Sequence, residues 1–168
     1  VIISAADAAR DTARPRVSIL GAGQGHTHEH LIAAPSLTEF GCRHSATEAF
    51  GRAGVKASDI DVAEIYDSFS FTPLIALEGF GICGPGEAGD WVLEGNAKLG
   101  GKLPMNTNGG GLSYTHTGMY GMFAILEAVR QLRGEAFRQV PDVKTSVVQG
   151  VGGMFTAAAT LVLSNQEP

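Results

Sequence analysis

The side chains best suited to chemistry in this sequence lie in one polar, glycine-rich segment, residues 106–118, which contains Tyr114 and His116. Residues two apart point to the same side of an extended segment, so the phenol and the imidazole can face one ligand. A helix is expected to follow, and the partial positive charge at its N-terminus favours developing anions and a neutral imidazole. A neutral histidine can donate a hydrogen bond to an oxyanion, which makes His116 a candidate catalytic residue. The spacing alone is equally consistent with a histidine that only holds the loop in place.

A second candidate site lies at residues 64–69, where an expected buried strand ends in a turn that contains Tyr66 and Asp67. The sites of α/β proteins gather at the carboxyl ends of their strands. Both side chains are therefore candidates for a site. A strand-end tyrosine followed by a surface aspartate would give the same pattern.

A third candidate is the run Gly-Val-Gly-Gly at residues 150–153. Adjacent backbone N–H groups in such a run can face the oxygen of a thioester. A plain hairpin turn between two strands explains the same glycines equally well. The run therefore marks either an oxyanion site or a turn.

Three alternating histidines, His26, His28 and His30, could present ligands to Zn²⁺ from an extended segment. The sequence holds no cysteine close to them and no second cluster of ligands, so a solvated loop is favoured and no metal is expected. The two cysteines, Cys42 and Cys83, are expected to be buried or incidental thiols rather than nucleophiles.

The elements that must position these residues follow from hydrophobic periodicity and from helix start and stop signals. Strands are expected at the apolar start of the chain and at 17–20, 61–69, 145–149 and 155–163; helices are expected at 37–53, 73–80 and 119–133. The capping-box spacing of Ser36 and Glu39 favours the first helix start, and Gly54 its end. This order predicts an α/β fold in which helices cover a mixed five-stranded sheet.

Composition limits the classes of function. The chain has 168 residues, 44% of them hydrophobic and 17% charged, which is typical of one globular domain. A net charge of -5 without a basic cluster does not favour binding to nucleic acid or to an anionic membrane. No apolar run approaches the ~20 residues of a membrane-spanning helix. Two cysteines make no disulfide framework, so a cytoplasmic location is expected.

Taken together and in this order, the motifs resemble the C-terminal half of the thiolase superfamily, most closely its lipid-transfer-protein type. The resemblance rests on residues 66–69, 103–110, 113–116, 131–135, 138–140 and 150–153. It implies a layered αβα half-molecule. Residues 1–14 would be the end of an N-terminal thiolase half and a linker, and residues 15–168 the C-terminal thiolase-like domain.

The sequence departs from thiolases where a thiolase needs its second cysteine. In that family the loop histidine activates a nucleophilic cysteine of the N-terminal half, and a second cysteine acts as acid and base. The places for the second cysteine hold Ser68 and Gly150, and Tyr66 stands where thiolases carry Asn or His. Thr117 replaces the proline that usually follows the histidine. A hydroxyl is a far poorer base than a thiolate, so a Claisen-type reaction is not expected.

These departures resemble the thiolase-like aldolases of bacterial steroid side-chain degradation, which cleave a β-hydroxyacyl-CoA by a retro-aldol step. The resemblance implies that Tyr66 and Tyr114 transfer protons, in an order that the sequence leaves open. It implies that His116, with backbone N–H groups of Gly152 and Gly153, holds the enolate oxygen.

The resemblance also adds Asp67 to the catalytic set and Asn108 and Gly110 to the oxyanion or substrate contacts. It implies a CoA thioester as substrate and no further cofactor. The implied partners are the N-terminal thiolase half, a zinc-ribbon/OB-fold protein and further copies in a homodimer or higher oligomer. Two alternatives stay open: a lipid-transfer acyltransferase, and a non-catalytic scaffold subunit.

Overall fold

The computed structural model describes residues 1–9 and 13–166. Short 3₁₀ turns at Asp7–Ala9, Leu31–Ala33 and Ala57–Asp59 accompany the main elements. The strands and helices follow one another along the chain as β1 (Ser18–His26), α1 (Gly41–Ala53), β2 (Val62–Ile65), α2 (Phe71–Phe80), α3 (Ala88–Leu93), α4 (Gly110–Tyr114), α5 (Gly121–Arg133), β3 (Thr145–Gly152) and β4 (Ala157–Ser164).

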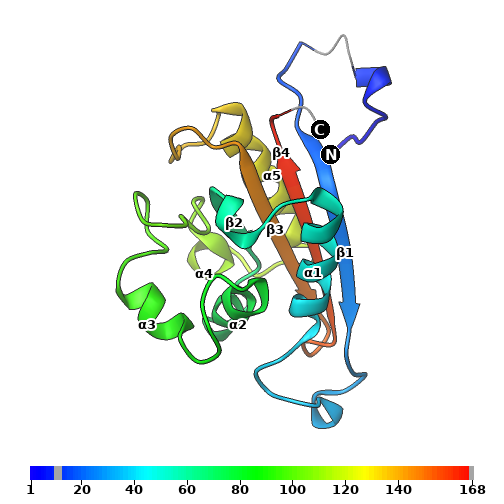
Figure 1. The fold of residues 1–168 in the computed structure, drawn as a ribbon, viewed down its shortest axis with the longest axis vertical. Helices are drawn as coiled ribbons and strands as arrows, with labels where there is room; N and C mark the ends of the chain where they lie inside the picture. Colours follow the sequence, from blue (N-terminus) through cyan, green and yellow to red (C-terminus); the bar gives the residue numbers. More distant parts are fainter. Residues whose placement is uncertain (10–12, 167–168) are drawn as a thin grey trace.

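The strands form one mixed sheet in the order β1-β4-β3-β2. Strands β2 and β3 run parallel, whereas β3 pairs antiparallel with β4 and β4 with β1 (Figure 1). The α/β class and mixed sheet are confirmed, but the described residues form four strands rather than the five expected. The apolar start of the chain makes no strand, because Val1, Ile2 and Ile3 are 68%, 97% and 74% exposed and have no sheet neighbour to bury them.

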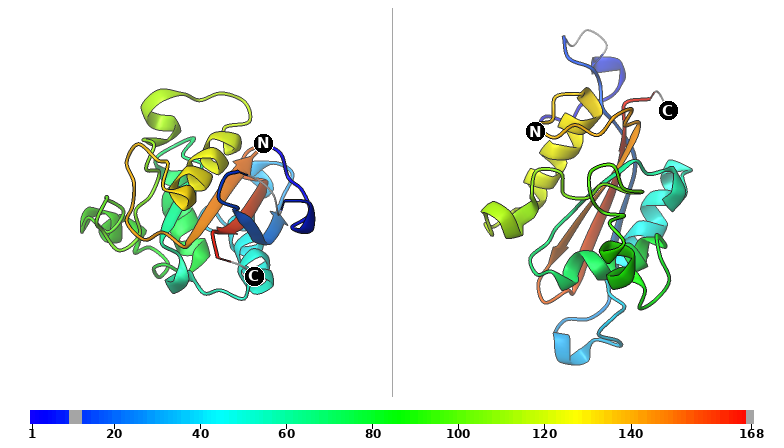
Figure 2. Two further views of the ribbon diagram at one scale, coloured as in Figure 1. Left: turned by 90° about the horizontal axis from the view of Figure 1, so that it is seen from above. Right: turned by 90° about the vertical axis from the view of Figure 1, so that its left-hand side faces the viewer.

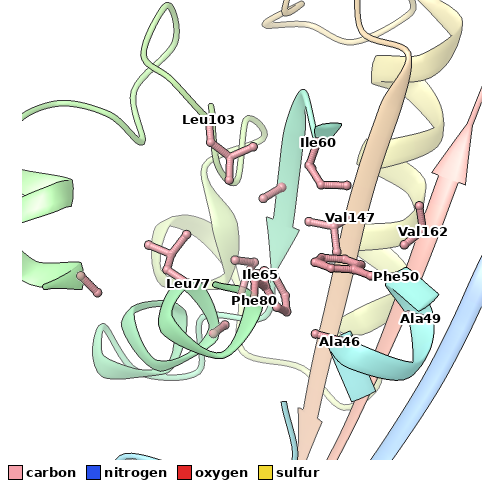
Figure 3. Packing of buried hydrophobic residues seen from close by; sticks show 13 residues of the cluster. Ala46, Ala49, Phe50, Ile60, Ile65, Leu77, Phe80, Leu103, Val147 and Val162 are labelled. Carbon is pink, nitrogen blue, oxygen red and sulfur yellow. The ribbon is translucent and has the colours of Figure 1, made fainter. Parts of the chain in front are cut away.

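Helices cover both faces of the sheet, with α1 and α2 on one side and α5 on the other (Figure 2). Gly21, Gly23 and Gly25 of β1 lie directly under α1. A methyl group at any of them would overlap a backbone carbonyl oxygen of that helix. Figure 3 shows the core beneath α1 and α2, in which Phe50, Ile65 and other apolar side chains meet.

A second core lies between the sheet and α5. Val62, Val148 and Leu163 of the strands pack there against Ala124, Ala128 and Leu132 of α5. The apolar spacing predicts the helix but only part of its buried face, because Leu132 is buried whereas Met122, Phe123 and Leu126 are 38%, 39% and 42% exposed. Gly134 ends the helix in the left-handed conformation at φ 71°, as its glycine predicts.

One expected boundary of α1 was wrong and the other was right. The capping box does not start α1, which begins at Gly41 after Phe40 without a side-chain cap. Instead, the Ser36 hydroxyl accepts a hydrogen bond from the Thr38 N–H at 3.1 Å in a local turn. The predicted end of α1 is confirmed, since Gly54 adopts φ 68°.

The glycine-rich segments hold more regular structure than the sequence indicates. Residues 81–111 contain α3 and the start of α4. Gly150 and Gly152 lie inside β3 and pair with Ala159 and Ala157 of β4, so the turn begins only at Gly153. Backbone pairing across the hairpin extends both strands beyond their β-branched residues. No helix within residues 1–9 and 13–166 is long and apolar enough to cross a membrane.

Candidate active site

An open pocket of about 490 Å³ lies on the α5 side of the sheet, beside the segment that leads into α5. Because α5 packs mainly on β2 and β3, it leaves part of β1 and β4 uncovered on this face. Its walls come from the end of β2, the loop before α5, the β3–β4 hairpin and β1. The lining includes Tyr66, His116, Tyr120, Gly152, Gln24 and His26.

Tyr66 and His116 are brought together at this pocket, although they are 50 residues apart. Tyr66 follows β2 directly and continues its ladder, because its N–H donates to the Gln149 carbonyl at 2.9 Å. Its phenol oxygen lies 3.4 Å from Nδ1 of His116. When the phenol donates to Nδ1, the imidazole carries its proton on Nε2 and can donate it to a ligand.

Tyr120 is a third tyrosine at the pocket, which the sequence reasoning missed. Its ring stacks on Tyr66 with centroids 5.0 Å apart, and it is only 3% exposed. Burial first, and then neighbouring Tyr114 and Asp67, raise the pKa of Tyr120 above its ordinary value. The phenol therefore keeps its proton and acts as a hydrogen-bond donor rather than a base. Its place one residue before a strongly periodic helix was the available signal.

Tyr114 ends α4 and is half exposed, outside the residues that line the pocket. Its phenol oxygen accepts a hydrogen bond from the Asn108 amide at 3.1 Å, and its ring lies 6.3 Å from that of Tyr120. The segment at Tyr114 is helical rather than extended. Tyr114 and His116 therefore do not form the simple same-side pair that their spacing suggested.

Asp67 lies beneath α4 and is 5% exposed. Its carboxylate accepts hydrogen bonds from the N–H groups of Gly111 at 2.7 Å and Leu112 at 3.2 Å. Gly110 adopts φ 71°, and a methyl group there would overlap this carboxylate. The Asn108 side chain accepts from the Gly110 N–H at 2.9 Å. Asp67, Asn108 and Gly110 thus fix the turn that carries Tyr114.

The three glycines of residues 150–153 do not all lie at the pocket. Gly152 lines the pocket, as does Gly150, whereas Gly153 starts the turn at φ 60° and lies outside the lining. Gly152 therefore lies at the pocket, where its contact with an oxyanion stays a prediction. The Gly153 contact remains a prediction.

The opposite wall comes from β1, where Gln24 and His26 face the pocket; the sequence reasoning missed this as well. Nε2 of His26 lies 2.6 Å from the Gln24 amide nitrogen. The three alternating histidines do not point to one place. Strand β1 ends at His26, and Nε2 of His28 contacts the Met154 carbonyl oxygen at 3.1 Å. Within the described parts of the chain, no three His, Cys, Asp or Glu side chains gather as a metal site.

The two thiols lie elsewhere. Cys42 is buried in α1 and Cys83 follows α2, and neither lines the pocket. Burial raises the pKa of both thiols, which disfavours the thiolate. The pocket residues that the structure describes thus offer phenols, imidazoles and backbone amides, but no thiol.

Comparisons with a protein family and with individual known proteins agree that this chain is thiolase-like. The model of the family described as thiolase C-terminal domain-like matches residues 23–165. The steroid side-chain-cleaving aldolase of Thermomonospora curvata is 33% identical over 168 aligned residues, which cover 96% of this chain and 42% of that protein. The 17-hydroxy-3-oxo-4-pregnene-20-carboxyl-CoA lyase of Mycobacterium tuberculosis gives the same identity and coverage.

Among solved structures, the Ltp2-ChsH2(DUF35) aldolase superposes with a TM-score of 0.85 at 34% identity, covering 95% of this chain and 42% of that one. The chain therefore spans about two fifths of the length of these relatives. The likeness extends over nearly the whole chain.

Proposed function

We infer the function of this chain from the fact that it belongs to the thiolase C-terminal domain-like family. We propose that it forms the C-terminal half of an enzyme that cleaves a β-hydroxyacyl-CoA by a retro-aldol reaction. The observation that carries the proposal is the Tyr66–His116 contact at a pocket lined by no thiol. Similarity to a steroid side-chain-cleaving aldolase and to a CoA lyase favours a bulky, steroid-type acyl group.

The reaction needs one group that accepts a proton from the β-hydroxyl of the substrate. In our proposal the Tyr66 phenol takes that proton as its own proton passes to Nδ1 of His116, 3.4 Å away. The bond between the α and β carbons breaks, and its electron pair moves into the CoA-thioester enolate. The β carbon leaves as a ketone.

The enolate oxygen needs hydrogen-bond donors. His116 donates from Nε2, and the backbone at Gly152 lies in the same pocket. The proton held by the Tyr66–His116 pair then returns to the α carbon and gives the shortened acyl-CoA, so atoms and charges balance. Tyr114 is the alternative proton carrier, because its ring lies beside that of Tyr120 at the edge of the pocket.

Residues 15–168 are proposed as the C-terminal domain, and the N-terminal half is proposed to complete the pocket. The solved aldolase is named for two components, Ltp2 and ChsH2(DUF35), which supports a second subunit for this protein too. We propose that this subunit is of the zinc-ribbon/OB-fold type that the sequence resemblance implies. We also propose a CoA-thioester substrate, no further cofactor and a cytoplasmic location.

The test is ketone release from a 17-hydroxy steroid acyl-CoA by the complete protein with its partner subunit. Tyr66→Phe and Tyr114→Phe are each expected to lower kcat, by ~10²-fold or more for the variant that lacks the proton carrier. Ser68→Ala is the matched control, because Ser68 bonds to Thr72 at 3.1 Å and lies outside the pocket lining.

Unchanged turnover in both tyrosine variants would refute the proton-transfer roles proposed for Tyr66 and Tyr114. Loss of turnover in Ser68→Ala alone would indicate thiolase-like chemistry, with Ser68 in the place of the second cysteine. Failure of the unsubstituted protein to release any ketone would refute the aldolase activity itself.

A further inference from the structure

Two glutamates lie in the core between β2 and α5. Glu64 of β2 is 1% exposed and Glu127 of α5 is 4% exposed. Both carboxyl groups contact one hydroxyl, that of Thr107, at 2.8 Å and 2.7 Å. Within the described residues, no Lys or Arg forms an ion pair with either carboxyl. Two unpaired negative charges in such a place would carry a large desolvation cost.

The hydrogen bonds of these groups show how this desolvation cost is avoided. The amide nitrogen of Gln131 donates to the Thr107 hydroxyl oxygen at 2.8 Å and lies 3.3 Å from Oε1 of Glu127. The amide is oriented by the Val140 N–H, which donates to its oxygen at 3.0 Å. The Thr107 N–H donates to Oε1 of Glu64 at 3.3 Å. The hydroxyl has a single hydrogen, so it can donate to only one of the two carboxylates. The other short contact between two oxygens has a hydrogen between them only when that carboxyl is protonated and donates to the hydroxyl oxygen.

The same residues connect the elements around the candidate active site. Thr107 begins the segment that carries Tyr114 and His116, and Glu127 lies on the helix that follows it. The neighbouring Asn106 is tied to β2, since its side chain accepts from the Ile65 N–H at 2.7 Å. The start of this segment and the helix that follows it are therefore both linked to β2 at Glu64 and Ile65, directly before Tyr66.

We propose that Glu64 and Glu127 share one proton through Thr107, and that this neutral-acid clamp positions the loop of residues 106–118 against Tyr66. The three residues are positioning residues and touch no reacting atom. Their effect on turnover rests on the retro-aldol function proposed above. The shared proton itself does not.

The surroundings of the clamp give it a pH dependence. The titratable groups that face it are Asp67 after β2 and Tyr120 before α5, both acidic. The β3 residue opposite Glu64 is the uncharged Val148. Burial is the first cause that raises the pKa of Glu64, from 4.5 to about 8. The folded state thus keeps a proton that the unfolded chain releases, so stability is lost as pH rises from about 4.5 to 8.

The test uses the full chain and two measurements that need no substrate. Denaturant unfolding from pH 4 to 9 is expected to show an alkaline fall in stability, with one more proton bound by the folded state. Infrared spectroscopy is expected to show a protonated-carboxyl band at pH 6 that disappears by pH 9. Glu64→Gln and Glu127→Gln, which mimic the neutral acid, should remove the band and flatten the fall.

Two further variants serve as controls. Glu29→Gln removes an exposed carboxylate and should leave both the band and the slope unchanged. Thr107→Ser keeps the bridging hydroxyl and should behave like the unsubstituted protein, whereas Thr107→Val removes it and should abolish the shared-proton band. In turnover, Glu64→Gln should move the alkaline limb of the kcat/KM profile to higher pH.

The absence of the band at pH 6, or a slope that persists in both glutamine variants, would overturn the shared proton. The same holds if neither glutamine variant folds while Thr107→Ser does, because a neutral side chain would then not be tolerated. A confirmed band with an unshifted kcat/KM profile in an active enzyme would overturn the positioning role. A confirmed band without retro-aldol turnover would instead count against the proposed function alone.

Discussion

The Asp67 carboxylate should determine whether residues 110–114 keep their helical turn. It accepts two backbone hydrogen bonds, at 2.7 Å and 3.2 Å, from a buried position. Asp67→Asn retains one neutral acceptor and turns an amide N–H₂ group toward the second N–H. A hydrogen bond to a charged group contributes about 1.5–3 kcal/mol and a neutral one about 1 kcal/mol. Losing one bond and weakening the other should lower the free energy of unfolding by about 2–4 kcal/mol.

Urea unfolding measures this loss, and Asp59→Asn is the matched control. Asp59 also accepts a backbone N–H, that of Lys56 at 2.8 Å, but at an exposed 3₁₀ turn. Its replacement should cost no more than ~1 kcal/mol. The reasoning would be refuted if Asp67→Asn unfolded like the unsubstituted chain while kcat fell 100-fold. In that case Asp67 would act on the substrate, as the sequence resemblance predicted.

Two further predictions concern the fold. Gly23→Ala should drive its methyl group onto the Ser45 carbonyl, separate α1 from β1 and lower the free energy of unfolding by ~3 kcal/mol or more, as measured by thermal or urea unfolding. Gly51→Ala lies in open space on α1 and should raise that free energy by ~0.5–1 kcal/mol. Equal melting temperatures of the two variants would contradict this packing. In sedimentation, the chain alone should self-associate through the exposed apolar side of α5, and glutamine substitutions should raise the monomer fraction; a monodisperse monomer at all concentrations would argue against it. The residues to be replaced are Met122, Phe123 and Leu126.

Local patterns predict the elements whose apolar spacing and end signals are clear. Helix α5 follows from its apolar spacing and from Gly134, and its observed start differs from the expected one by two residues. Strand β1 is predicted only at its beginning, because Gly21, Gly23 and Gly25 have low strand propensity. Those glycines belong to the strand because α1 lies against them, and this contact joins residues too far apart in sequence for a local pattern to indicate.

Some residues of the candidate site are predicted from the sequence, and others reach it only through the fold. The family resemblance predicts Tyr66 and His116 for one site, and the structure brings their side chains to 3.4 Å from each other. Tyr120, Gln24 and His26 join the pocket only through the packing of β1 and α5 on the sheet. The bridge from Glu64 to Thr107 spans 43 residues, so no spacing rule could reveal it.

The tyrosine–histidine pair fits one of the two reactions open to this fold better than the other. A Claisen-type transfer must hold the acyl group covalently, which requires a thiolate. The nucleophilic cysteine would come from the N-terminal half, but the places for the second cysteine hold Ser68 and Gly150, and both described thiols lie outside the pocket with raised pKa values. A retro-aldol cleavage forms no bond to the enzyme. It requires a proton acceptor for an alcohol and donors for an enolate, and a phenol 3.4 Å from an imidazole can supply both, since the proton accepted by Tyr66 moves on to His116. We therefore propose that Tyr66 and His116 serve the retro-aldol reaction; a nucleophilic cysteine in the N-terminal half would instead favour acyl transfer.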